Sequence, residues 1–336
     1  MTYSVGGLIQ AADYNGFVGP TASGGTSNAN LNDIWNVGSG DKGWGQTVVS
    51  NPVAGNTVTA TQWATLVNNL ATAGSQTGTT LTSRSAPTAG TTISILAALN
   101  TDLTNVTTNR GNAAASGTEY GVFSGTTSKT TATGSGTSAW TITFTHTITF
   151  PSANQARYFW NAGGIVRLKY GKSSTGTDHD ADWNTFAGQC GSINLTGRVN
   201  GAAQTIAAQS YTGTTRLNGS GGTETTLATT TGWYNLTGTP TTIFQLNNIT
   251  APYQPEFIRT TATATSSTVL TLVTTWVDDG SSGAGVSSNI SGGTATTSPS
   301  TTITGTAPTT LVTYIPPSTS FLSNTWGTPS IAASVA

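Results

Sequence analysis

The chain has 336 residues, which is enough for one large domain or two ordinary ones with sizeable cores. Only 7% of its residues are Asp, Glu, Lys or Arg, against about 25% in typical soluble proteins, and the formal net charge is −1. Because nucleic acids and anionic lipids are bound by clustered Lys and Arg side chains, this composition argues against both classes of partner. The one basic cluster, at Arg167, Lys169 and Lys172, is expected to lie on a solvated strand face.

The composition nevertheless predicts an ordered, Thr-rich β protein. Disordered chains usually combine low hydrophobicity with high net charge, whereas this chain carries nine tryptophans and recurrent β-branched runs.

Its single cysteine, Cys190, excludes an intrachain disulfide and a cysteine-based zinc site, and we expect its thiol to be buried and neutral. The first residues lack the basic and apolar regions of a signal peptide, and no run approaches the roughly 18 apolar residues of a membrane span.

Residues 1–58 combine aromatic side chains with many glycines and show no sustained periodicity. This pattern predicts irregular backbone pinned by aromatic anchors, and we interpret the region as a docking arm. Trp35 and Trp44 are its candidate interface residues, because aromatic side chains in desolvated pockets often dominate protein–protein contacts. We expect both to be buried against a neighbouring subunit or another protein.

Residues 59–125 are expected to form a helical hairpin and oligomerisation region. The stretch "TATQWATLVNNLATAG" (59–74) begins with a capping-box pattern, places its apolar residues on one helical face and has Gly74 as a stop signal. A second helix is expected within 91–111, where heptad spacing extends over fewer than three heptads at Leu96, Leu99, Leu103 and Val106. Either the two helices pack together as a hairpin, or the apolar stripe forms a short coiled-coil seam between subunits.

Residues 126–336 are expected to form a Thr-rich β-sandwich or jelly roll, so the predicted fold class is mainly β. The stretch "SAWTITFTHTITF" (138–150) alternates strictly and places His146 among apolar residues, which is typical of a half-buried strand. The stretch "ARYFWNAGGIVRLKYG" (156–171) predicts a β-hairpin around Asn-Ala-Gly-Gly. Further strands are expected at 192–200, 203–211, 225–230, 241–249, 256–264 and 268–277, with one more in the tail.

The stretch "DHDAD" (178–182) holds three aspartates and one of the two histidines of the chain. Asp180 or Asp182 can cap the following helix, "WNTFAGQ", by accepting hydrogen bonds from free backbone N–H groups. A calcium loop would lack its closing glutamate, and a zinc site would need more histidines. A glycosidase would need a distant second carboxylate such as Asp278 or Asp279. We favour the cap, and therefore expect no catalytic residue, no metal site and no cofactor.

Several motifs resemble those of one class of proteins. "RYFWNAGGIVRL", "DADWNTF" and "GSINLTG" together are similar to a pattern in virion structural proteins of large tailed phages, of the cyanobacterial and marine myophage type. "GLIQAADYNGFVG", "NDIWNVGSGDKGWGQ" and "VTATQWATLVNNL" resemble the N-terminal region of the same proteins. These motifs lie within 6–70 and 156–197, and residues 215–336 carry none.

The resemblance implies a non-enzymatic virion component, as a tail fibre or as a fibre-attachment, baseplate or neck protein. Its expected partners are further copies of itself in a homo-oligomer, a trimer in the case of a fibre, and other virion proteins. A capsid decoration or head-fibre protein is one alternative. Another is a carbohydrate-binding or depolymerising protein that acts on a host surface glycan.

Overall fold

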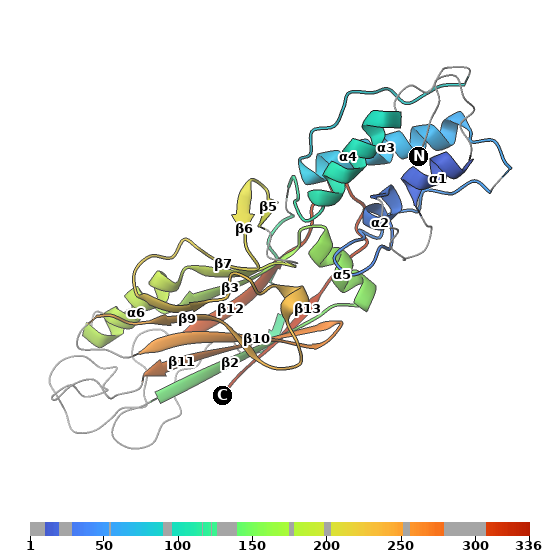
Figure 1. The fold of residues 1–336 in the computed structure, drawn as a ribbon. Helices are drawn as coiled ribbons and strands as arrows, with labels where there is room; N and C mark the ends of the chain where they lie inside the picture. Colours follow the sequence, from blue (N-terminus) through green and yellow to red (C-terminus); the bar gives the residue numbers. More distant parts are fainter. Residues whose placement is uncertain are drawn as a thin grey trace.

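The computed structural model describes residues 11–19, 29–53, 55–89, 96–115, 117–121, 123–125, 140–174, 178–197, 203–250, 256–278 and 307–336. The molecule is elongated, with a helical region at one end and β-sheets at the other (Figure 1). The helical region contains α1 (Ala11–Val18), α2 (Leu31–Trp35), α3 (Ala60–Thr77) and α4 (Leu96–Thr108). None of the described helices combines the length and the apolar character that crossing a bilayer requires.

The larger sheet has seven strands in the order β1-β13-β2-β11-β10-β9-β8. Neighbouring strands are antiparallel, except that β1 runs parallel to β13. On β2 the alternation predicted for 138–150 is confirmed, because Ile142, Phe144, His146 and Ile148 are fully buried. The strands are β1 (Phe123–Gly125), β13 (Ser330–Val335), β2 (Trp140–Thr149), β11 (Val269–Asp278), β10 (Phe257–Ser266), β9 (Thr241–Asn247) and β8 (Thr223–Leu227).

A four-stranded sheet packs against the larger one and completes a β-sandwich. Its order is β12 (Thr309–Ile315), β3 (Ile165–Gly171), β4 (Ser192–Leu195) and β7 (Thr214–Leu217). The ring of Tyr170 stacks on Phe244 at a centroid distance of 6.0 Å, and its hydroxyl lies 2.9 Å from Thr260 Oγ1. Trp276 Nε1 donates to Thr310 Oγ1 at 3.0 Å. The mainly β fold class is therefore confirmed.

Helix α3 begins as its sequence predicts. Thr59 Oγ1 accepts a hydrogen bond from the Gln62 backbone N–H at 3.2 Å, while Gln62 Oε1 accepts one from the Thr59 N–H at 2.8 Å. This reciprocal pair is a capping box. The helix continues past Gly74 and ends at Gly78, whose φ of 63° lies in the left-handed region.

The expectation that Trp35 and Trp44 of residues 1–58 are buried against a partner is wrong. Tyr14 of α1 packs edge-on against Trp63 of α3 at 5.1 Å, and the buried side chains of both ends of the molecule form one continuous cluster. Trp35 is 7% exposed and Trp44 is 1% exposed within the single chain. These indoles are core residues, so they cannot be the anchors that we expected to contact a partner.

The apolar stripe of α4 is also covered within the chain. Leu99, Leu103 and Val106 are fully buried and belong to the same core cluster. The side chain of Leu96 lies outside the described residues. The two helices therefore pack as the intramolecular alternative predicts, and the described part of the stripe is not open to another subunit.

The first arm of the predicted hairpin at 156–171 is a helix, α5 (Ala153–Asn161), and this prediction is wrong. Ser152 Oγ accepts a hydrogen bond from the Gln155 backbone N–H at 3.2 Å and so starts the helix. Ala156, Phe159 and Trp160 are fully buried at helical spacing, although the aromatic residues of this stretch favour a strand. Gly163, with a φ of 100°, turns the chain into β3.

The remaining elements refine the predicted strand list. The stretch 203–211 is a two-stranded hairpin, β5 (Gln204–Ile206) and β6 (Gln209–Tyr211), whose turn holds Ala207 and Ala208 at positive φ. A 3₁₀ turn, η1 (Trp233–Asn235), precedes β9, and α6 (Asp178–Cys190) connects β3 to β4. Strands β1, β7 and β13, the second strand of the tail, were not predicted from the sequence.

The basic cluster is divided between two environments. Arg167 and Lys169 lie on the outer face of β3, where Glu119 pairs with them at 2.9 Å and 2.6 Å. Lys172 is instead buried at 8% exposure, so the expectation of a solvated face is wrong for this residue.

His146 leads to a prediction about acid stability. Its imidazole is fully buried, and this burial lowers its pKa to about 4. An unfolded histidine has a pKa of about 6.5, so the unfolded chain binds more protons between these two values. The native state should therefore lose about 3 kcal/mol from this residue as the pH falls from 7 to 4.

We expect His146→Leu to lose correspondingly less unfolding free energy over the same pH range. Urea denaturation of both proteins at pH 7 and pH 4 measures the difference. Equal losses in the two proteins would mean that the imidazole is not held neutral in the core.

Candidate functional site

The helical region and the sandwich meet at a junction built from residues 36–46 and helix α5 (Figure 1). Four glycines in this segment adopt positive φ, which folds it into a tight loop. A Cβ at Gly43 would collide with the Val37 carbonyl, and one at Gly45 would collide with the Tyr158 ring. Glycine is therefore needed at both positions, because the loop backbone lies directly against itself and against α5.

Asn161, the last residue of α5, connects three parts of the chain. Its Nδ2 donates to the backbone carbonyls of Lys42 at 2.8 Å and Gly43 at 3.1 Å. Its backbone carbonyl accepts from Trp44 Nε1 at 3.0 Å, and its Oδ1 accepts from the Tyr234 hydroxyl at 2.6 Å. The side-chain amide of this buried residue thus forms hydrogen bonds with the loop and with the 3₁₀ turn, and its backbone carbonyl forms one more with the loop.

Charged side chains surround the same loop. The guanidinium of Arg157, one helical turn before Asn161, donates to the backbone carbonyls of Val37 and Gly38. Arg110, just after α4, forms an ion pair with Asp41 at the tip of the loop. In a chain with so few charges, these contacts concentrate electrostatic interactions at the junction.

A segment between β12 and β13 closes the other side of the loop. Gln46 Nε2 donates to the Ser323 carbonyl at 3.0 Å, and Gln46 Oε1 accepts from the Ser323 N–H at 2.9 Å. Thr325 Oγ1 donates to the Trp44 carbonyl at 2.6 Å. Residues near both ends of the sequence are therefore joined by side-chain contacts.

The junction brings together the segments "NDIWNVGSGDKGWGQ" and "RYFWNAGGIVRL", which are more than a hundred residues apart. Both segments stand out as motifs in the sequence, but their contact was not predicted. The closely spaced glycines and the Asn-Ala-Gly-Gly helix end were the available signals. Both indicate backbone that must pass close to another group.

The acidic segment begins α6, as predicted, but Asp182 is not a cap. The helix starts at Asp178, so Asp182 lies in its second turn, where it is buried at 8% exposure. Asn248 Nδ2 donates both to the carboxylate of Asp182 and to Glu256 Oε2, the latter at 3.0 Å. Asp182 therefore joins α6 to the neighbouring ends of β9 and β10.

The positions of the other candidate side chains cannot be compared. The side chains of Asp178, His179, Asp180 and Asp278 lie outside the described residues, as does Asp279 entirely. Within the described part of the chain, no group of three or more His, Cys, Asp or Glu residues could hold a metal ion.

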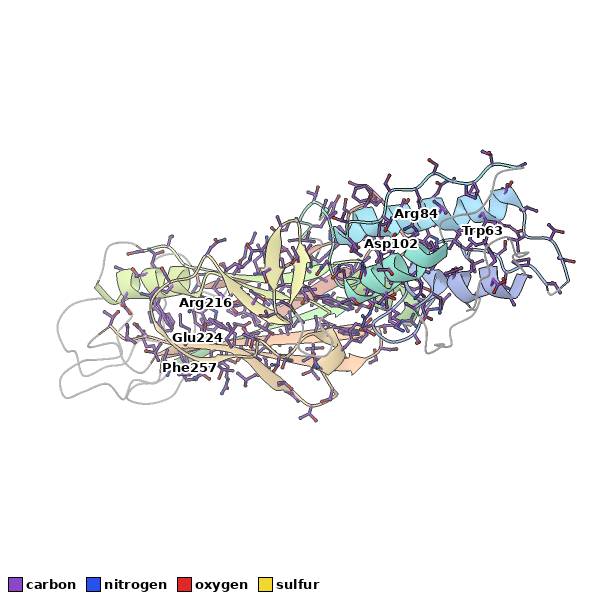
Figure 2. The ribbon with its side chains drawn as sticks, turned by 45° about the horizontal axis from the view of Figure 1, so that its top comes forward. Trp63, Arg84, Asp102, Arg216, Glu224 and Phe257 are labelled. Atoms are coloured by element: carbon purple, nitrogen blue, oxygen red, sulfur yellow. The ribbon has the colours of Figure 1, made fainter. Side chains whose placement is uncertain are left out.

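Cys190, at the end of α6, is fully buried, as expected. Burial raises the pKa of its thiol well above the ordinary range, which keeps it protonated and unreactive. Arg216 of β7 donates to the Gln189 carbonyl at 2.6 Å and pairs with Glu224 of β8 at 3.2 Å (Figure 2). The Arg216 side chain thus places a positive charge at the C-terminus of α6 and also links the two sheets.

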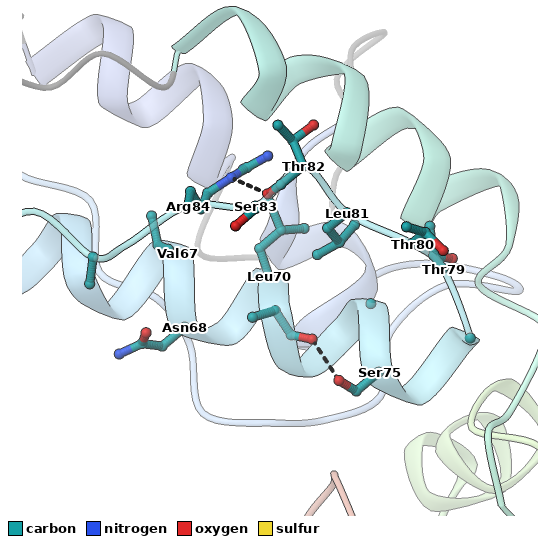
Figure 3. Close-up of a pocket in the computed structure, with 14 residues that line it drawn as sticks. Val67, Asn68, Leu70, Ser75, Thr79, Thr80, Leu81, Thr82, Ser83 and Arg84 are labelled. Atoms are coloured by element: carbon teal, nitrogen blue, oxygen red, sulfur yellow. Dashed lines mark hydrogen bonds between the residues drawn. The ribbon is translucent and has the colours of Figure 1, made fainter.

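A groove of about 460 Å³ runs between α3 and the extended segment 78–86 (Figure 3). Val67, Leu70 and Leu81 contribute apolar surface, and Arg84 lies at one end. The Arg84 side chain is 6% exposed and pairs with Asp102, which is 3% exposed. No His, Cys, Asp or Glu is among the described residues that line the groove.

Searches against protein-family models, curated proteins and solved structures found no match to this chain.

The first prediction from the site concerns Asn161. Asn161→Ala removes the buried donor to the loop and leaves the Tyr234 hydroxyl without its acceptor, so we expect a loss of about 3 kcal/mol in unfolding free energy. Asn100→Ala, at an exposed position of α4, is the matched control and should have little effect. Urea denaturation measures both, and equal midpoints would contradict the role assigned to the junction.

The second prediction concerns divalent cations. The Asn248 amide hydrogens occupy the space between the Asp182 and Glu256 carboxylates, where a cation would have to lie. We therefore expect millimolar Ca²⁺ and EDTA to leave the melting temperature unchanged. A chelator-reversible rise that is present in the natural protein and absent from Asp182→Asn would show that calcium binds there.

Proposed function

We propose that the protein is a non-enzymatic structural component of a tailed-phage virion, as a tail fibre or a fibre-attachment or baseplate protein. The proposal rests on the resemblance of its motifs to those of myophage virion proteins. The observation that carries it is the junction, because two of those motifs supply its loop and its helix. The residues of these two motifs form hydrogen bonds with one another, which gives a physical reason for the two motifs to occur together in one protein.

The charged side chains support a structural rather than a catalytic role. Glu119 pairs with Arg167 and Lys169, and Glu224 pairs with Arg216. Asp102 pairs with Arg84 and accepts from the Thr82 backbone N–H at 3.1 Å. Carboxylates held in this way stabilise the fold, whereas general acid–base catalysis needs a carboxylate or imidazole directed at a substrate.

The outer face of the larger sheet also suits a surface component. The half-buried rows at its centre consist mainly of β-branched side chains, many with a hydroxyl, which have stiff rotamers. Thr143, Thr145 and Thr147 of β2 lie in register with Thr275, Val273 and Thr271 of β11. Such a face offers hydrogen bonds without the cost of desolvating charges.

Oligomerisation belongs to the proposal, although it must use surfaces other than those first expected. Trp35, Trp44 and the described α4 stripe are buried within the chain. The exposed large apolar side chains of the described residues lie elsewhere, at Val48, Val53, Tyr120, Ile249 and Phe321. We propose a homo-oligomer, with a trimer expected for a fibre.

Antibody labelling of intact particles in electron micrographs tests the proposal. Antibodies raised against the purified chain should label the tail of the phage that encodes it, because the protein would be part of the particle. Label on the head instead would identify the capsid decoration or head-fibre alternative. Particles without label, with the protein left in the unassembled fraction of the lysate, would overturn the virion assignment.

A further inference from the structure

Asp182, Asn248 and Glu256 form a hydrogen-bonded group at the end of the sandwich that lies away from the helical region, where α6 is found (Figure 1). All three are buried, and so is Lys172, the first residue after β3. Removing a charged side chain from water is costly, so buried lysines and carboxylates are rare in folded proteins. Their presence together in a chain with few charges points to a specific role.

The topology of the sandwich places Lys172 at the same end. Strand β3 follows α5 and β9 follows η1, so both strands begin at the junction and run away from it. Lys172 is the first residue after β3, and Asn248 is the first residue after β9. The two strands face each other across the core, where the Tyr170 ring stacks on Phe244. Lys172 lies two residues beyond Tyr170, so the alternation of a strand directs both side chains into the same interior.

The side-chain amide of Asn248 is held at both of its ends. Its Oδ1 accepts a hydrogen bond from the Thr250 backbone N–H at 2.9 Å. Its Nδ2 donates to the carboxylates of Asp182 and Glu256. A donor on the carbonyl oxygen stabilises the negative charge that develops there when a nucleophile adds to the carbon. Carboxyl groups on the nitrogen can donate a proton to it as it leaves.

We propose that Lys172 and Asn248 form an intramolecular amide cross-link between the two sheets. Lys172 Nζ attacks Asn248 Cγ, so that a new C–N bond forms and the bond from Cγ to Nδ2 breaks. The lysine ammonium and the asparagine amide become one secondary amide and one ammonium ion. Atoms and charge therefore balance, and the reaction needs no oxidant and no co-reactant.

The two carboxylates supply the proton transfers that this reaction requires. Two protons must move from Lys172 Nζ to the departing Nδ2, because an ammonium is no nucleophile and an amide anion is a poor leaving group. Asp182 and Glu256 contact Nδ2 from two directions and can accept and return these protons. The fold holds the amide in place, which replaces an encounter in solution by a reaction within one structure.

The cross-link would join β3 of the four-stranded sheet to β9 of the larger sheet. It lies at the end of the sandwich away from the junction, where the hydrogen bonds of Asn161 join the sandwich to the helical region. The sandwich would then resist separation of its sheets even when its hydrogen bonds are broken. This inference does not depend on the virion assignment, because it concerns the isolated chain.

Mass spectrometry of the purified full chain tests the proposal. We expect an intact mass below that of the sequence by the mass of one ammonia molecule. A tryptic digest should contain a branched peptide in which Lys172 is joined to Asn248. An intact mass equal to that of the sequence, with both residues recovered only in linear peptides, would overturn the proposal.

Two lysines of the same region provide a matched pair of variants. Lys172→Arg keeps the positive charge but removes the amine, so it should abolish the loss of ammonia and the branched peptide. Lys169→Arg makes the same change on the outer face of β3 and should retain both. A loss of ammonia that persists in Lys172→Arg would assign it to another asparagine and overturn the proposal. The peptide map of the natural protein decides the question even if Lys172→Arg does not fold.

Glu256→Gln separates the proton transfers from the placement of the amide. Glutamine still offers an acceptor to Asn248 Nδ2 but cannot exchange a proton with it. We expect a folded variant, identified by its melting curve, in which the branched peptide is largely lost and the linear peptides are recovered. An unchanged yield of the branched peptide would overturn the role proposed for this carboxylate.

Discussion

The buried amide of Asn161 is the constraint on which the arrangement of the two ends of the molecule depends. Its side chain donates to the glycine-rich loop and accepts from Tyr234, while its backbone carbonyl accepts from Trp44. A hydrophobic contact alone would allow the helical region to slide against the sandwich. Directional hydrogen bonds in a dry environment fix one geometry, because each misplaced group would be left unsatisfied.

Sequence patterns correctly predicted those helices and strands that depend on neighbouring residues or on a single buried face. The capping box of α3 and the alternation of β2 are such cases, and both are present in the structure. The stretch that contains α5 misled the prediction because Tyr158, Phe159 and Trp160 favour strands by type. Burial of Ala156, Phe159 and Trp160 on a helical face decided the outcome instead, and that burial depends on residues distant in sequence.

In the candidate sites, too, features set by neighbouring residues were predicted, whereas contacts between residues far apart in the sequence were not. The acidic segment was correctly expected to open a helix, yet the partners of Asp182 come from β9 and β10 and could not be read from its neighbours. Trp35 and Trp44 were expected to meet another molecule because the surrounding sequence offers no obvious core. Trp44 instead contacts α5 and the segment between β12 and β13, and Trp35 packs against Trp44, so the surface that covers them belongs to the same chain.

The position of β2 in the larger sheet has a consequence for how the chain folds. Both of its hydrogen-bonded neighbours, β11 and β13, follow it only after long stretches of sequence. Pairing strands so far apart requires large loops to close before any stabilising contact is gained, which slows folding. Until β13 arrives, one edge of β2 has unpaired N–H and C=O groups next to an apolar face. Such an edge can pair with another chain, so the folding intermediate should be more prone to aggregation than the finished sheet.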